Sequence, residues 1–228
     1  MSDLSRTYTL DGLRDALRRG GPVPVPEAPA PAPASLPADP WGVLTAALGR
    51  VNVPLTVAAT PEAAREAIQA VLAEFSARTV AMWRHPDLGG LGLPALLERL
   101  GVGVVEPGAS DGGDECFCRK AATCDLGITS AHAVLLDTGT ILVRAGLGLE
   151  RSTSIVPPVH LAVIPRRALA AGTPNIPGIV RSLCEDGTPP SALHLITGPS
   201  STRDIELAQV FGVHGPMAVR AVGLDFDL

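Results

Sequence analysis

The chain has 228 residues, of which 46% are apolar and only 3% aromatic, so its core must be built mainly from aliphatic side chains. A formal net charge of -5 provides no basic face, and we expect no nucleic-acid partner. The length suits one α/β domain with an extension.

No stretch of the sequence approaches the roughly 20 uninterrupted apolar residues that a membrane-spanning helix requires. Residues 1–10 also lack the apolar region of a secretory signal peptide. We therefore expect a cytoplasmic protein without a membrane span. In that compartment its four cysteines would be reduced thiols.

The N-terminal residues differ in composition from the rest of the chain. Apolar side chains recur on one helical face of residues 10–19 and end at two glycines, which predicts an amphipathic helix within residues 1–21. Residues 22–40 contain eight prolines and five alanines and are expected to form an extended linker. We favour a simple spacer over a recognition motif here. The α/β domain is expected to span residues 41–228.

Two helix-start signals follow the linker. Asp39-Pro40 combines an N-cap residue with a proline at the first helical position, which predicts a short helix that ends at Gly49. Thr60-Pro61 repeats the signal, and apolar side chains then recur at helical spacing as far as Phe75. Further helices are predicted at residues 94–100 and 177–184.

Short apolar runs between these helices predict strands. The predicted strands are residues 53–58, 79–83, 102–105, 140–143, 161–164, 193–196 and 217–222. Continuously apolar strands that alternate with helices indicate parallel neighbours covered on both faces. We predict an α/β fold with a largely parallel sheet flanked by helices.

Ligands of open parallel sheets bind at the carboxyl ends of the strands, so the segments after strands are the first places to look for chemistry. Three segments rich in Gly, Thr, Ser and His compete: residues 127–140, 157–160 and 197–216. The third offers glycine amides, several hydroxyls and the Arg203 guanidinium. These groups together favour a carboxylate or phosphate ligand.

The third segment also has a purely structural interpretation. Ser201 or Thr202 could cap a following helix, with Asp204 and Glu206 interacting favourably with the helix dipole. Because one set of hydroxyls can both cap a helix and bind an anion, the two interpretations stay open.

In this order and spacing, the three segments resemble the lactate utilization protein C family, whose shared domain is called the LUD domain. The matching strings are Gly127-Ile128-Thr129 leading into Asp137-Thr138-Gly139-Thr140, Pro157-Pro158 with His160, and Thr197-Gly198-Pro199-Ser200 through Asp204-Ile205-Glu206 to Gly212-Val213-His214-Gly215-Pro216. The resemblance implies the NagB/RpiA/CoA-transferase-like fold. It also implies a part in oxidising L-lactate to pyruvate beside iron-sulfur partner proteins, with no cofactor on this chain.

Imidazoles and carboxylates in these segments are candidates for acid-base chemistry or for contact with an anion. The acid-base candidates are Asp137, His132, His214 and Glu206. The ligand-binding candidates are Thr129, Thr138, Gly139, Thr140, Thr197, Gly198, Ser200, Ser201, Thr202, Arg203 and Asp204. Asp137 could instead cap its own turn, and His85 and His194 are expected to be structural.

Three closely spaced cysteines raise the question of a metal site. Cys116, Cys118 and Cys124 are thiols of the kind that bind zinc or iron-sulfur clusters, but their spacing differs from the usual ligand patterns. We expect loop thiols and no metal. Iron-sulfur clusters are expected on the partner chains instead.

Two functions of different classes remain. The first is a subunit without a redox group in a lactate-oxidising system, which binds a small carboxylate or phosphate and contacts iron-sulfur partners. The second is a freestanding isomerase-like or transferase-like enzyme that acts on a small phosphorylated or CoA-linked metabolite, which the implied fold permits but does not require.

Overall fold

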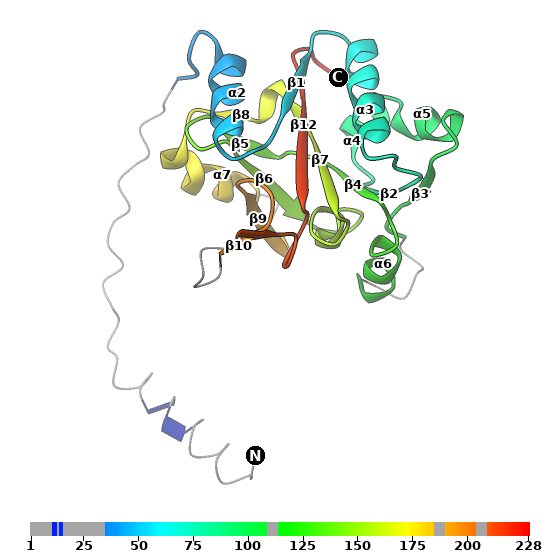
Figure 1. Cartoon of the computed structure of the whole chain (residues 1–228). Coiled ribbons are helices and arrows are strands. Elements are labelled where there is room, and N and C mark those ends of the chain that lie inside the picture. The colour runs from blue at the N-terminus through cyan, green and yellow to red at the C-terminus, as the bar shows by residue number, and fades with distance from the viewer. Residues whose placement is uncertain (1–10, 13, 16–34, 109–113, 185–189, 204–208) are drawn as a thin grey trace. The chain divides into compact units, whose positions relative to one another are not determined.

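The computed structural model of the chain describes residues 11–12, 14–15, 35–108, 114–184, 190–203 and 209–228 (Figure 1). The chain divides into two compact units, residues 1–30 and 31–228. Of the predicted helix at residues 10–19, the structure describes only residues 11–12 and 14–15, which are helical; most of the linker lies outside the described residues. Within the first unit, the Arg14 guanidinium donates to the Asp11 carboxylate at 3.3 Å.

The second unit is built on a sheet of six parallel strands, as the apolar pattern predicted (Figure 1). In spatial order these strands are β1 (Leu55–Ala58), β12 (Ala218–Leu224), β7 (Val159–Pro165), β4 (Leu126–Ser130), β2 (Thr79–Met82) and β3 (Gly103–Val105). The central strands β4 and β7 are buried along their whole length. They form the middle of the main hydrophobic core.

Helices cover this sheet and begin where the sequence signals them. The described helices of the second unit are α2 (Pro40–Arg50), α3 (Pro61–Glu74), α4 (Pro86–Gly90), α5 (Leu93–Arg99), α6 (Asp114–Ala121) and α7 (Ile176–Ser182), with the 3-10 turns η1 (Arg151–Ser154), η2 (Arg166–Ala168) and η3 (Thr173–Asn175). Asp39 caps α2 by accepting from the Gly42 amide at 2.9 Å. Thr60 caps α3 by accepting from the Ala63 amide at 3.2 Å. No helix among the described residues is both long enough and apolar enough to cross a bilayer.

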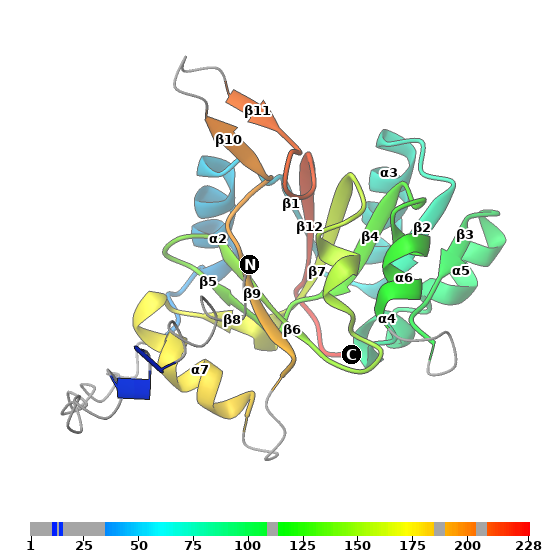
Figure 2. The same ribbon diagram turned by 90° about the horizontal axis from the view of Figure 1, so that it is seen from below.

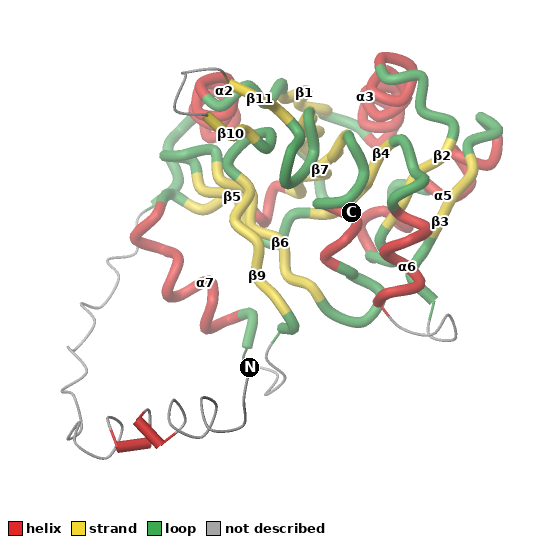
Figure 3. Tube along the Cα trace, turned by 60° about the horizontal axis from the view of Figure 1, so that its bottom comes forward, coloured by secondary structure: helices red, strands yellow, loops and turns green. Residues whose placement is uncertain are grey.

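A second, smaller sheet was not predicted. It consists of β8 (Leu169–Ala170), β5 (Ala133–Leu135), β6 (Thr140–Ala145) and β9 (Ala192–Ile196), in that spatial order, and it contains antiparallel pairs. Figures 2 and 3 both place α7 beside this sheet, on the side away from β2 and β3. A separate hairpin pairs β10 (Ser201–Arg203) with β11 (Gln209–Phe211).

The two faces of β4 contact different elements because side chains alternate along a strand. Ser130 points toward α4, where its hydroxyl bonds to Asp87. Gly127 lies under η1, and a Cβ atom there would stand 1.8 Å from the Thr153 carbonyl oxygen. Only glycine therefore allows η1 to pack this closely on the sheet.

β4 passes directly from the main sheet into the second one. The Ala131 amide donates to the Val163 carbonyl of β7 at 2.8 Å, and the next amide, of His132, donates to the Leu142 carbonyl of β6 at 2.9 Å. Two consecutive residues thus bond to two different sheets. This joint places His132 between the sheets at the carboxyl end of β4.

Two sequence expectations are wrong in this region. Residues 126–130 form a central strand rather than a loop, because the glycine and hydroxyl residues that suggested a loop are buried under η1 and α4. Ser201 and Thr202 do not cap a helix, since they lie in β10 and pair with Phe211 and Val210 of β11.

Candidate functional site at the carboxyl ends of the strands

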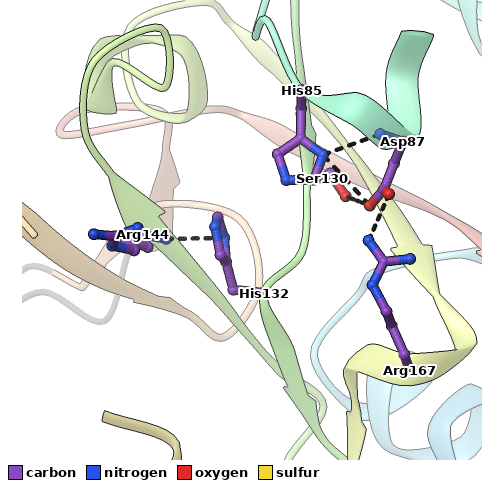
Figure 4. A network of polar contacts seen from close by, with 6 residues as sticks. All are labelled: His85, Asp87, Ser130, His132, Arg144 and Arg167. Carbon is purple, nitrogen blue, oxygen red and sulfur yellow. Dashed lines mark hydrogen bonds and ion pairs between the residues drawn. The ribbon is translucent and has the colours of Figure 1, made fainter. Parts of the chain in front are cut away.

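Strands β2, β4 and β7 are parallel, so the segments that follow them meet at one edge of the main sheet. Polar side chains from these segments, together with the backbone amide of Arg144 on β6, form a group that we name the carboxyl-end network (Figure 4). Its members are His85, Asp87, Ser130, His132, Arg144 and Arg167.

Asp87 is the centre of this network (Figure 4). Its side chain is only 4% exposed, yet its carboxylate accepts from the Ser130 hydroxyl at 2.6 Å and from the Arg167 guanidinium at 2.5 Å. Burial alone would raise the pKa of Asp87, but the hydrogen bonds from Arg167 and Ser130 and the nearby positive charge outweigh it and lower the pKa. Asp87 is therefore a buried carboxylate anion at neutral pH.

Arg167 has a different environment from its partner. Its side chain is 61% exposed, while one nitrogen of the guanidinium is held by the buried Asp87. A guanidinium has five N–H donors, so this contact leaves donors that face solvent. The result is a fixed cationic group at the sheet edge, of the kind that binds carboxylates.

His85 caps α4 and borders Asp87. Its Nδ1 lies 3.3 Å from the Asp87 amide nitrogen, from which it accepts, and 3.4 Å from the Asp87 carboxylate. Burial lowers the pKa of His85, although the negative charge of Asp87 opposes the shift. A neutral ring whose Nδ1 accepts carries its proton on Nε2.

His132 follows the same pattern. Its Nδ1 accepts from the Arg144 amide at 3.2 Å, and its ring meets the rings of His85 and Trp83 edge-on, with centroids 5.7 and 6.0 Å apart. Burial, assisted by the positive charges nearby, lowers the pKa of His132 to about 4. His132 is thus neutral near pH 7, with its proton on Nε2.

The network therefore supplies hydrogen-bond donors rather than a proton acceptor. The guanidinium of Arg167 and the Nε2–H groups of His85 and His132 can all donate. A general base would need a free lone pair on an imidazole, and in both rings that lone pair already accepts a backbone N–H. This arrangement favours binding of an anion with several oxygen atoms.

Asp137, a predicted acid-base residue, lies outside the network. Its carboxylate accepts from the amide and the hydroxyl of Thr173, at 2.8 and 3.0 Å. The Arg50 guanidinium donates to the Asp137 carbonyl at 2.9 Å. Burial opposes ionisation, but the two Thr173 hydrogen bonds lower the pKa of Asp137. Asp137 therefore links the β5–β6 turn to the first residue of η3.

The predicted threonines of the same turn form a chain of hydroxyls. Thr138 bonds to Thr140 at 2.7 Å, and Thr140 bonds to Thr197 at 2.9 Å. Gly139 and Gly198 both have positive φ, at 71° and 102°. A Cβ on Gly198 would stand 2.7 Å from the Val51 carbonyl oxygen, and one on Gly139 would stand 3.0 Å from the Leu48 amide nitrogen. The structure thus joins these predicted residues to each other and to α2.

The remaining residues of the third segment are near β10 and β11. The Ser200 hydroxyl accepts from the His214 amide at 3.3 Å, and His214 is exposed. Ser201 pairs with Phe211 in the hairpin. Asp204 and Glu206 lie outside the described residues, as do the side chains of Thr202 and Arg203.

Thr129 is buried on β4 and bonds to another family-motif residue. Its hydroxyl lies 2.8 Å from Nε2 of His160 on β7. Both residues are 0% exposed, and burial, with the charge of His194, lowers the pKa of His160 to about 4. Thr129 is adjacent in sequence to Ser130 but points to the opposite face of the sheet.

The cysteines show no metal-binding arrangement in the part of the chain that the structure describes. Cys124 is buried, its sulfur lies 3.5 Å from the Lys120 carbonyl, and burial raises the pKa of its thiol to about 11. Cys118 is half-buried and free of any disulfide. The Cys116 side chain lies outside the described residues.

Five members of the network had no place among the predicted site residues: His85, Asp87, Ser130, Arg144 and Arg167. The one usable signal was His85-Pro86-Asp87 directly after the predicted strand at 79–83, since polar residues after a parallel strand lie at the ligand-binding edge. Arg167 gave no comparable signal, because it approaches Asp87 only through the fold.

The six-stranded parallel sheet flanked by helices defines an α/β protein. The family model of the LUD domain matches residues 43–222, and the chain belongs to this family. The expected resemblance is therefore confirmed.

Named relatives agree with this assignment. Lactate utilization protein C of Halalkalibacterium halodurans is 36% identical over 156 residues, which are 67% of this chain and 65% of that protein. The Bacillus subtilis protein of the same name is 32% identical over 157 residues, again 67% and 65%. The matched part thus spans slightly less than two thirds of the length of these relatives.

A solved structure supports the fold. The crystal structure of a DUF162 family protein from Deinococcus radiodurans is similar with a TM-score of 0.56, and the match covers 84% of this chain and 99% of that one. The two sequences are 19% identical, so the similarity bears on the fold alone.

Proposed function

We propose that this chain is a component of L-lactate utilisation and that its carboxyl-end network binds a small carboxylate. Membership of the LUD domain family and the names of the relatives support the pathway. The proposed ligand class rests mainly on the exposed Arg167 guanidinium. Buried Asp87 holds this group in place beside two neutral imidazoles.

The chemistry of the network suits a 2-hydroxy or 2-oxo acid. The carboxylate of such a ligand would pair with Arg167, since guanidinium and carboxylate match in shape and charge. The 2-hydroxy or 2-oxo oxygen of the ligand would accept a hydrogen bond from an imidazole N–H. Both rings are uncharged, and the Asp87 carboxylate offsets one of the two guanidinium charges of Arg144 and Arg167, so we expect a monoanion to be favoured over a phosphate dianion.

Oxidation of lactate to pyruvate removes two electrons and needs an acceptor. The side chains of the network supply charge and hydrogen bonds but no electron acceptor. We therefore propose that iron-sulfur partner chains accept the electrons, and that this chain holds the carboxylate or presents it to them.

The ligand proposal is tested by titrating the full chain with L-lactate and with pyruvate, followed by NMR. We expect saturable binding that weakens about tenfold or more in Arg167→Ala, since a charged hydrogen bond contributes about 1.5–3 kcal/mol. Arg166→Ala is the matched control: Arg166 is the preceding residue, is 55% exposed and pairs with Asp225 instead. Equal affinities in the two variants would exclude Arg167 from the site.

The pathway proposal is tested by purification from the native host. Tagged chain should retain iron-sulfur polypeptides under gentle conditions, with the optical absorption of such clusters in the complex. Recovery of the chain alone, together with turnover of a phosphorylated or CoA-linked metabolite by it, would instead support a freestanding enzyme.

A further inference from the structure

A second polar region lies under η1, on the face of β4 opposite to the one from which Ser130 contacts Asp87. His160 is 0% exposed, and only one of its ring nitrogens is bonded, to Thr129. Its Nδ1 has no protein partner, and the buried hydroxyls of Ser152 and Thr153 have none either. A buried polar atom without a partner costs about 1–3 kcal/mol unless water or a ligand bonds to it.

These unpartnered atoms lie close together in the fold. Gly127 is the register partner of His160, and the Thr153 carbonyl oxygen stands directly over Gly127. Ser152 and Thr153 belong to the single turn η1. Three atoms that need hydrogen-bond partners are therefore gathered around one short turn.

A cavity of about 460 Å³ opens beside the same turn. We name it the η1 cavity, and it is lined by Gly146, Leu147, Glu150, Arg151 and Ser191. Its volume falls within the range of sites that bind small molecules. It shares no residue with the carboxyl-end network.

The lining has one cationic and one apolar feature that a ligand could use. Arg151 is exposed and is the first residue of η1. Leu147 is 89% exposed, because the tight turn between Gly146 and Leu149, with Gly148 at φ 78°, holds it outward. Glu150 lines the same cavity and would repel a second negative charge on a ligand.

We propose that the η1 cavity is a second binding site, which takes an aliphatic monocarboxylate, with the carboxylate on Arg151 and the chain against Leu147. This inference goes beyond the proposed function and does not depend on it.

The pKa of His194 can report whether the η1 cavity is occupied. It lies on β9, and burial together with the charge of Arg151 lowers its pKa, while His194 in turn lowers the pKa of His160. A carboxylate bound to Arg151 would cancel part of that charge. The pKa of His194 should therefore rise when the cavity is occupied.

The experiment uses full-length protein with isotope-labelled histidine, titrated with butyrate, with the His194 signal assigned by a His194→Asn variant. We expect a saturable shift and a raised His194 pKa with butyrate, and neither with the neutral analogue butyramide. Arg151→Gln should weaken butyrate binding about tenfold or more, and Arg151→Lys should retain most of it. Arg99→Gln, a change at an exposed arginine on α5, should leave the affinity unchanged.

Three results would overturn the inference: no saturable response at His194, equal affinity in Arg151→Gln and Arg99→Gln, or a response that is lost in Arg167→Ala but kept in Arg151→Gln. The last result would place butyrate in the carboxyl-end network. Conversely, failure of lactate to bind the network while butyrate still shifts His194 would contradict only the proposed function.

Discussion

The carboxyl-end network and the glycine-rich and hydroxyl-rich segment at residues 197–216 are organised in opposite ways. In the network, side chains from distant segments bond to one another around a buried carboxylate. In the segment, the described contacts are mainly close backbone packing, as at Gly198 against Val51, and hydroxyls bonded to other hydroxyls or to backbone. The described part of a segment that identifies a family can therefore be held by packing.

The largest expected effect that tests this contrast is on folding. In Gly198→Ala, the new Cβ would meet the Val51 carbonyl at 2.7 Å at a φ of 102°, so we expect a loss of about 2–4 kcal/mol of unfolding free energy. Urea denaturation measures it. The control is Gly49→Ala, where a Cβ meets nothing within 4 Å and the helix should gain up to about 1 kcal/mol. Unchanged stability in Gly198→Ala, with altered ligand binding, would make the segment a ligand loop.

A smaller expected effect on the free energy of unfolding distinguishes Asp87 from Asp137. Asp87→Ala should cost about 2–3 kcal/mol, because it leaves the buried Ser130 hydroxyl and one side of Arg167 without their partner. Asp137→Ala should cost about 1 kcal/mol, since its bonds to Thr173 lie at the exposed surface. Denaturation of both variants under one condition gives the comparison. The reverse order would contradict the central place of Asp87.

A third test uses the histidines, whose effect on the free energy of unfolding grows with the change in pH. Burial lowers the pKa of both His132 and His160 from 6.5 to about 4, so between these values the unfolded chain binds more protons than the folded one. Stability is therefore complete above pH 6.5 and falls as the pH drops toward 4, by about 1.4 kcal/mol per pH unit for each histidine. Urea denaturation at pH 7.5, 6.0 and 5.0 measures the slope.

His132→Asn is the matching variant for the pH experiment. It removes one histidine whose pKa is lowered to about 4, so the slope between pH 6 and 5 should fall by about 1.4 kcal/mol per pH unit. A slope equal to that of the unaltered chain would show that His132 titrates near its ordinary pKa and is not buried in the network.

Local signals in the sequence were enough for the strands of the main sheet other than β4 and for the long helices α2 and α3. Asp39-Pro40 and Thr60-Pro61 marked helix starts that the structure confirms, and apolar runs such as residues 161–164 marked the parallel strands. These features depend on residues close together in the chain. For that reason capping chemistry and side-chain periodicity predict them.

What the sequence could not predict depends on contacts between distant residues. β4 was interpreted as a loop because Gly127 and Thr129 look like turn residues, and only the contact with η1 explains their burial. Arg167 lies 80 residues from Asp87, and Ser130 lies 43 from it, so no local pattern links them. Two strands of the second sheet were predicted, at residues 140–143 and 193–196, but their antiparallel pairing was not. β8 and β5 were missed because strands of two or three residues carry too little periodicity.

The joint at Ala131 and His132 has a consequence for ligand binding. Because consecutive amides bond to β7 and to β6, the two sheets cannot open about a hinge there without losing hydrogen bonds in both. They should unfold in one cooperative transition, and the groups at the joint are held in place before any ligand arrives. A three-carbon acid makes few contacts, so measurable affinity for it requires this kind of pre-organised site, where binding orders little that was free.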